Sequence, residues 1–225
     1  MLLSSWHSKP PVIIEPQAYM LGAVKDYLGR SSVRVSGKLQ LPNKVDEFHD
    51  TEQPLLDYVA RLLETNGYLY SIIRRHQENC TNCHEFQTLE SEQLAKQINN
   101  CYSFRFDSKG WDEQERVIKV YHGRLIAPRL RDRRSKLSFL AGAYARYGSH
   151  RDSVYTIMLG NSTSKYNLIT HQLNTLRCRI EANEIIAGVP TAQKIRFVPT
   201  VELRAYLDEQ NPIVDSIAVQ RKRSK

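Results

Sequence analysis

Apolar residues recur along this chain at two different spacings, and the change between them predicts its secondary structure. Over residues 17–28 they recur every three or four positions, as on one side of a helix, and Gly29 would end that helix. Over residues 32–41 they alternate with polar ones, which predicts a hairpin around Gly37 with Val33, Val35, Leu39 and Leu41 on its buried face. The solvated face would then carry Arg34, Lys38 and Gln40.

The same two spacings continue as far as residue 101. They predict a helix over residues 53–65, strands over 68–76 and 84–89, and a short helix over 92–99. Residues 47–51 are interpreted as a polar insertion. The predicted order of elements in this part of the chain is α, β, β, α, β, β, α.

The order is then repeated in the second half. Helices are predicted over residues 137–147, 164–176 and 201–207, and strands over 154–159, 179–187 and 194–198. Residues can be matched between the two copies, and a repeat of type, order and spacing is improbable by chance. The matched pairs are Leu41 with Leu159, Asn43 with Asn161, Leu55 with Ile169, Val59 with Leu173, Leu62 with Leu176, Ser91 with Thr200 and Leu94 with Leu203.

The first helix of each copy contains a stretch of small residues. Residues 140–148 read Leu-Ala-Gly-Ala-Tyr-Ala-Arg-Tyr-Gly, and residues 21–28 read Leu-Gly-Ala-Val-Lys-Asp-Tyr-Leu. Small side chains let two helices approach closely, so these two helices are expected to pack on each other. The stretch around Gly142, with its weaker copy around Gly22, resembles the LAGLIDADG motif of homing endonucleases and group I intron maturases.

The resemblance covers residues 17–208 and implies a fold class. In the single-chain, double-motif form of this family, two pseudo-symmetric αββαββα halves pack through their motif helices as a monomeric pseudo-dimer. Their two antiparallel sheets form a saddle that lies along a nucleic-acid groove. The expected α+β organisation is an extended segment (1–16), a first half (17–101), a basic connector (102–136), a second half (137–208) and a basic tail (209–225), which we expect to be a flexible arm unless a polyanion orders it.

The catalytic position of the family is altered in both copies. The endonucleases place a carboxylate at the eighth motif position of each helix, where it binds divalent metal. With Gly22 and Gly142 at the third position, Tyr27 and Tyr147 occupy the eighth. A neutral phenol is no substitute for a carboxylate ligand of Mg²⁺, so we predict no catalytic residues, no metal site, no cofactor and no double-strand cleavage. Asp26 is the one acid that a shifted helix could present instead.

Charge favours a polyanionic partner. The chain of 225 residues has 32 Lys and Arg against 24 Asp and Glu, a formal net charge of +8, which favours nucleic acid over a membrane surface. The connector is the most basic part, and the last residues are basic as well. The residues predicted to bind nucleic acid are Arg34, Lys38, Gln40, Gln87 and Arg196 on the sheets, Arg129, Arg131, Arg133 and Arg134 in the connector, and Arg221, Lys222 and Arg223 in the tail.

Other chemistry finds less support in the sequence. No run of apolar residues is long enough to span a membrane, and residues 1–10 are too short and too weakly basic for an obvious signal or transit peptide. Four cysteines in a chain of this length favour a reducing compartment over a disulfide scaffold. A zinc site formed by His76, Cys80, Cys83 and His84, with Cys101 nearby, has suitable spacing but lacks a second CxxC.

These observations together favour a LAGLIDADG-like protein that holds nucleic acid without cutting it. RNA is favoured over DNA, in a structural (rRNA-binding) or maturase-like component of an organellar ribonucleoprotein such as the mitochondrial ribosome, with protein neighbours there. The alternatives are a DNA homing endonuclease or nickase with an atypical metal site that uses Asp26 or an acid outside the motifs, and a DNA-binding regulator on the same fold.

Overall fold

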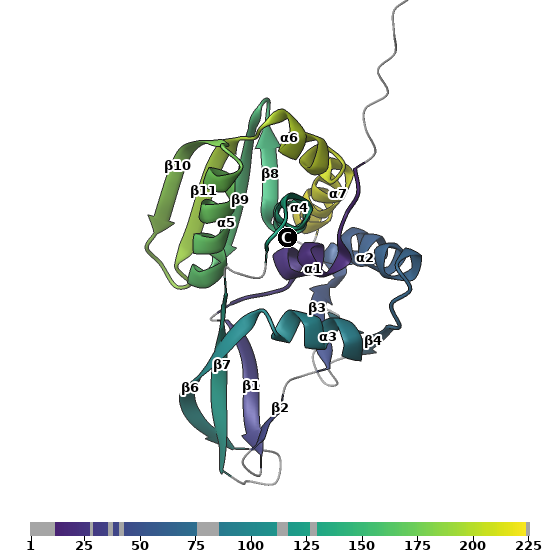
Figure 1. Cartoon of the computed structure of the whole chain (residues 1–225), viewed down its shortest axis with the longest axis vertical. Helices are drawn as coiled ribbons and strands as arrows, with labels where there is room; N and C mark the ends of the chain where they lie inside the picture. The colour runs from purple at the N-terminus through teal and green to yellow at the C-terminus, as the bar shows by residue number, and fades with distance from the viewer. Residues whose placement is uncertain are drawn as a thin grey trace, which may run out of the picture.

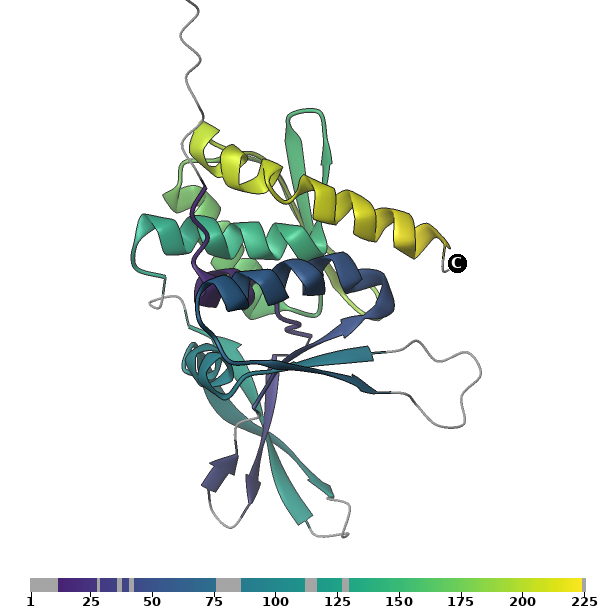
Figure 2. The ribbon, with the colours of Figure 1, turned by 90° about the vertical axis from the view of Figure 1, so that its right-hand side faces the viewer.

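The structure, a computed structural model, consists of two halves arranged around a central pair of helices (Figure 1). The pair comprises α1 (Pro16–Ala23) and α4 (Arg133–Tyr147), which lie side by side in both views of the ribbon (Figures 1 and 2). None of the described helices is long and apolar enough to cross a membrane. The structure describes residues 12–27, 29–35, 38–40, 43–75, 86–111, 117–126 and 130–223.

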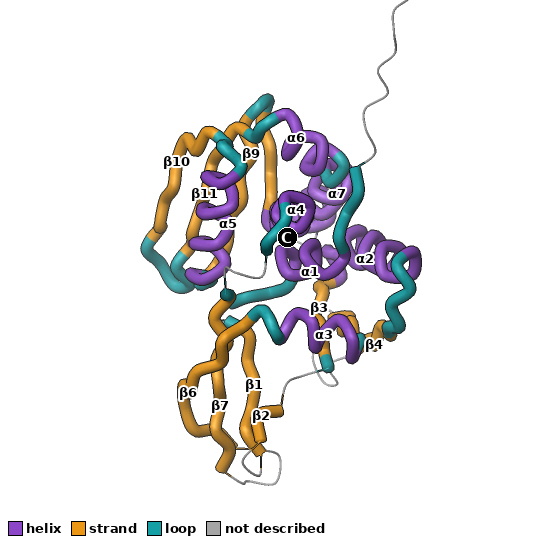
Figure 3. The backbone as a smooth tube through the Cα atoms, in the orientation of Figure 1, coloured by secondary structure: helices purple, strands orange, loops and turns teal. Residues whose placement is uncertain are grey.

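Each half contains one antiparallel sheet and two helices besides its motif helix (Figure 3). In the first half, β3 (Lys44–His49), β5 (Phe86–Glu90) and β4 (Ser71–Arg75) are neighbours in that order. In the second half the sheet order is β10-β11-β9-β8, in which β8 spans Gly148–Arg151, β9 Val154–Gly160, β10 Arg179–Ile186 and β11 Ala192–Val198. The helices are α2 (Gln53–Thr65) and α3 (Glu92–Asn99) in the first half, and α5 (Thr163–Thr175) and α6 (Val201–Asp208) in the second.

A third sheet, which the sequence did not predict, extends beyond the two halves (Figures 1 and 2). The connector forms a long hairpin, β6 (Tyr102–Trp111) and β7 (Val117–Leu125). β1 (Arg30–Val35) and β2 (Lys38–Gln40) pair as the predicted hairpin, but β1 then pairs with β7. The resulting sheet has the order β2-β1-β7-β6, and the first half retains three strands of its own.

The two motif helices touch through their glycines. A Cβ atom on Gly22 would lie 2.0 Å from the carbonyl oxygen of Phe139, and one on Gly142 would lie 1.9 Å from that of Tyr19. Phe139 precedes Gly142 by the same interval by which Tyr19 precedes Gly22, so the two contacts are equivalent under the exchange of halves. The predicted packing of the halves is confirmed, and so is the equivalence of Gly22 with Gly142.

The last helix of each half begins with an equivalent N-cap residue, as the matched pair Ser91 and Thr200 predicted. Ser91 caps α3 by accepting a hydrogen bond from the Leu94 amide, and Thr200 caps α6 by accepting one from the Leu203 amide. Both caps satisfy a backbone N–H that has no partner within the helix.

Three predictions about local structure were wrong. α1 ends at Ala23, not at residue 28. Residues 47–51 are no insertion, because β3 reaches His49 and is the strand that leads into α2. The hairpin register sets Arg34 opposite Leu39 and Val33 opposite Gln40, so the predicted separation of apolar and polar positions in β2 is shifted by one residue.

The predicted flexible tail is also wrong for the described residues. From Asn211 the chain forms helix α7 (Asn211–Arg223), which contacts α2 and α4. Ile213, Val214 and Ile217 are buried there. These apolar residues recur at helical spacing and give the basic segment a packed side.

The glycine contact predicts a large effect of a very small substitution. Gly142→Ala would force a methyl group into the Tyr19 carbonyl, and since backbone has to move, we expect a loss of about 3 kcal/mol or more in the free energy of unfolding. Urea denaturation measures this loss. The matched control is Gly160→Ala, whose added Cβ would lie 3.9 Å from the nearest atom, on Pro190. Equal stability of the two variants would contradict the close approach.

Candidate nucleic-acid interface

The early end of α1 leaves backbone carbonyls that side chains of the second half satisfy. The Lys165 ammonium donates to the carbonyls of Gly22, at 3.1 Å, and of Val24. The Arg146 guanidinium donates to the Ala23 carbonyl at 2.9 Å, and the Tyr147 hydroxyl donates to the Val24 carbonyl at 3.1 Å. Two cations thus cap the negative end of a helix dipole.

Arg146 is also the centre of a buried ionic cluster. Its guanidinium makes two hydrogen bonds to Glu52, at 3.0 and 2.8 Å, and an ion pair with Asp46. Arg221 from α7 adds a contact of 3.2 Å to Glu52. Burial by itself would raise the pKa of Glu52, but the Arg146 charge outweighs it and lowers the pKa to about 2. The cluster joins the second motif helix, the first half and α7.

Lys165 and Asp26 are buried beside this cluster, and the charge of each affects the pKa of the other. Asp26 is 3% exposed, and the Ser164 hydroxyl lies 3.5 Å from its carboxylate. Burial raises the pKa of Asp26, although the Lys165 charge opposes the shift. Burial lowers the pKa of Lys165 to about 8, with Asp26 again in opposition. We define these four residues, Asp26, Arg146, Tyr147 and Lys165, as the motif junction.

Comparison with solved structures identifies the fold. No protein-family model matches the sequence, and no curated protein matches it. The homing endonuclease I-DmoI in complex with DNA and Ca has a TM-score of 0.51 at 14% identity, with 92% of this chain and 97% of that chain covered. I-DmoI with DNA and Mn has a TM-score of 0.50 at 14% identity, over 88% and 96% of the two chains. The chain has the LAGLIDADG homing-endonuclease fold.

A third structure has a lower similarity to this chain. It is the N-terminal LAGLIDADG domain of DUF199/WhiA, with a TM-score of 0.42 at 14% identity, over 96% of this chain and 89% of that chain.

The motif junction of this LAGLIDADG fold does not fit the divalent metals of the endonucleases. The positions of the two expected carboxylates hold Tyr27, which is 53% exposed, and Tyr147, whose hydroxyl donates to a carbonyl. Asp26 directly precedes Tyr27, and the Lys165 charge acts on its buried carboxyl and opposes the rise of its pKa. In the part of the chain that the structure describes, no three His, Cys, Asp or Glu side chains are grouped to hold a metal. A cation is not expected to bind where two buried cations already lie.

The structure separates the sheet residues that were predicted to bind nucleic acid. Arg196 on β11 projects from the face opposite the buried Ile195 and Phe197, and it lies 3.6 Å from Glu181. Arg34 is on the third sheet, where its guanidinium lies over the Tyr121 ring at 5.1 Å. Lys38 and Gln40 occupy β2 at the edge of that sheet. Gln87 is buried and donates to Gln53, so its assignment to the solvated surface was wrong.

The basic connector and tail are also divided. Arg131 and Arg134 are exposed at the start of α4, the end of that helix remote from the motif junction, and Arg133 pairs with Glu202. Arg221 is bound to Glu52, whereas Lys222 and Arg223 are exposed in the last turn of α7. Arg129 and the predicted zinc ligands from His76 to His84 lie outside the described residues.

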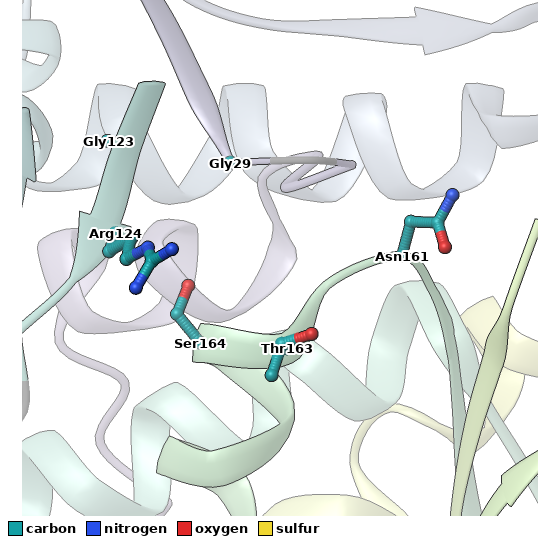
Figure 4. A pocket seen from close by; sticks show the side chains of 6 residues that line it. All are labelled: Gly29, Gly123, Arg124, Asn161, Thr163 and Ser164. Carbon is teal, nitrogen blue, oxygen red and sulfur yellow. The ribbon is translucent and has the colours of Figure 1, made fainter. Parts of the chain in front are cut away.

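One cavity lies where the third sheet meets the second half (Figure 4). Its volume is about 230 Å³, and the Arg124 side chain lies beside Ser164 in it. Arg124 was not among the residues predicted to bind nucleic acid, because its position next to the start of α5 depends on the fold. The guanidinium and the polar side chains around it could contact one phosphate. The other residues lining it are Gly29, Gly123, Asn161 and Thr163.

The Arg146 cluster predicts a dependence of stability on pH. The pKa of Glu52 is about 2 in the folded protein and 4.5 without its partners. Between these values the unfolded chain binds more protons, so the stabilisation is present above about pH 4.5 and is lost as the pH falls towards 2. Glu52→Gln should lower the urea midpoint at pH 7 and flatten its fall in acid. The control Glu209→Gln changes an exposed acid and should do neither; an unchanged acid slope in Glu52→Gln would contradict the assignment.

Proposed function

We propose that this chain binds nucleic acid without cleaving it, and that RNA is its ligand in preference to DNA. It would serve as a structural (rRNA-binding) or maturase-like component of an organellar ribonucleoprotein, with a mitochondrial ribosome as the favoured setting. The proposal concerns the whole LAGLIDADG fold, because both halves retain their sheets and their motif helices.

The observation that carries the proposal is the composition of the motif junction. In a nuclease of this fold, two carboxylates at the helix ends would hold the metals that activate water. Here the same ends are tied by Lys165, Arg146 and Tyr147 to the carbonyls of residues 22–24. These bonds hold the halves together and occupy the site with two cations and one phenol. Its one carboxylate, Asp26, is buried and under the Lys165 charge, so the pair of carboxylates that would hold the metals is missing.

Charge and fold support nucleic acid as the ligand. The net charge of +8 attracts polyanions, and I-DmoI, which has the same fold, is a homing endonuclease that has been solved in complex with DNA. On the outer face of the second-half sheet, Arg196 and Lys194 lie near Glu181 and Glu184. Because these acids partly neutralise the two cations, that face alone is not expected to bind phosphates strongly. Other exposed cations lie on the third sheet, at the start of α4 and in the last turn of α7.

The preference for RNA rests on two arguments. A LAGLIDADG fold without its catalytic carboxylates has lost the chemistry that acts on DNA. The cations that the first half, connector and tail expose are spread over several surfaces, Arg34, Lys119, Arg131 and Lys222 among them. Dispersed phosphate contacts suit the irregular shape of a folded RNA better than one straight duplex groove.

Binding and cleavage can be measured with the same protein. Fluorescence anisotropy with labelled duplex DNA and structured RNA should show salt-dependent binding, with the tighter affinity for RNA. Incubation of both with Mg²⁺ or Mn²⁺ should give no product. Asp26→Asn should leave the affinity for both nucleic acids unchanged. Neither this variant nor the unsubstituted protein should cleave them. Paired nicks in DNA that Asp26→Asn eliminates would replace this proposal by the nuclease alternative.

The ligand class in cells needs a separate experiment. Crosslinking followed by sequencing of the attached nucleic acid should recover RNA, concentrated in one ribonucleoprotein. Recovery of DNA alone would favour a DNA-binding regulator on the same fold. In vitro, the slope of log affinity against log salt concentration reports the number of phosphate contacts. The magnitude of this slope should fall by about 0.9 for each contact to a duplex that is removed.

A further inference from the structure

The third sheet has one face on which aromatic rings and cations alternate. Opposed residues of an antiparallel pair lie on the same side of a sheet, and the register opposes Phe106 to Tyr121, Lys109 to Lys119 and Trp111 to Val117. β1 adds Arg34 opposite Lys119. We call this side, formed by Arg34, Phe106, Lys109, Trp111, Lys119 and Tyr121, the aromatic face.

The aromatic face is exposed to an unusual degree for its composition. Trp111 is 72% exposed and Phe106 is 53% exposed. The sheet extends away from the two halves in both views (Figures 1 and 2), so neither half covers this end of it. Large apolar side chains are normally withdrawn from water, and exposed groups of them mark interaction sites.

The charges on the aromatic face have a single sign. Arg34, Lys109 and Lys119 are exposed, and no acid occupies a position on this side in the described residues of β1, β6 and β7. Asp107, at the bulge of β6, turns to the other side and lies 3.5 Å from His122. The face therefore suits an anionic ligand that also has flat apolar surfaces.

The rings on this face are partly ordered before any ligand binds. Phe106 and Tyr121 meet edge to face at 5.9 Å between ring centres, and the Arg34 guanidinium lies over Tyr121. The base of the sheet is fixed to the first half, because the buried Arg30 donates to the Val45 carbonyl at 2.9 Å and to the Lys44 carbonyl at 2.6 Å. A rigid base lowers the entropy cost of presenting the rings.

We propose that the aromatic face binds single-stranded nucleic acid by stacking bases on Trp111 and Phe106 while Arg34, Lys109 and Lys119 contact the phosphates. Unpaired bases expose their π-faces, whereas bases in a duplex are already stacked on each other. Within the proposed function, this names the class of RNA segment that is bound: an unpaired loop, bulge or linker. Any double-stranded segment of the ligand would be bound by other surfaces of the fold.

The fluorescence of Trp111 reports on stacking directly. The chain has two tryptophans, and Trp6→Phe leaves Trp111 as the sole one. Titration of this protein with oligouridylate or oligoadenylate should quench the emission in parallel with the anisotropy of the labelled strand. Titration with duplex RNA should not quench it. Binding of the single strands without quenching would overturn the proposal.

Substitutions test the same point by affinity. Trp111→Ala should weaken single-strand binding about 5- to 150-fold, the value of one stacked base, and Trp111→Phe should restore most of it. Lys109→Gln with Lys119→Gln should reduce the single-strand salt slope by about 1.4, from two phosphate contacts. Leu69→Ala removes an 87% exposed apolar residue outside this sheet and is the matched control, with no expected effect.

The outcomes separate this inference from the function on which it rests. If no RNA or DNA binds, both fail. If nucleic acid binds but Trp111→Ala and Phe106→Ala leave every affinity unchanged, the aromatic face is no nucleic-acid site, a protein neighbour is its remaining occupant, and the proposed function stands. Urea midpoints equal to that of the unsubstituted protein show that each variant is folded.

Discussion

The contact between Gly22 and Gly142 is the constraint on which the rest of this structure depends. Each glycine lies against a carbonyl of the opposite helix, at a distance that no side chain permits. The close approach brings the end of α1 within reach of Arg146, Tyr147 and Lys165 from the other half. Packing that requires two glycines thus determines where the buried charges lie.

Those charges now perform a structural task at the place where the endonucleases of this fold perform chemistry. A buried ion pair contributes little net stability unless its hydrogen-bonding groups are satisfied. Arg146 meets this condition, because it donates to Glu52, to Asp46 and to two backbone carbonyls, those of Ala23 and Glu47. These bonds therefore make the ends of the two motif helices a cross-brace between the halves.

Most of the architecture could be predicted from the sequence, and most of the surface could not. Helical spacing, strand alternation and the caps at Ser91 and Thr200 are local signals, and they identified both halves. The end of α1 was missed because it depends on bonds from Lys165, far along the chain. Val24 to Leu28 carry no helix-breaking residue. The pairing of β1 with β7 was missed for the same reason, because neither strand's sequence contains a signal that identifies its partner. Gln87 was misplaced because its burial follows from a partner, Gln53, on another element.

The departure of β1 from the first half has a consequence for the shape of any target. The motif helices contact each other in equivalent ways, but among the described residues the first half has a three-stranded sheet and the second a four-stranded one. The two halves of a palindromic nucleic-acid target would present identical groups to two different protein surfaces. The repeat in such a target would therefore add no affinity. Under the proposed function, the ligand that matches this scaffold is one whose own two ends differ.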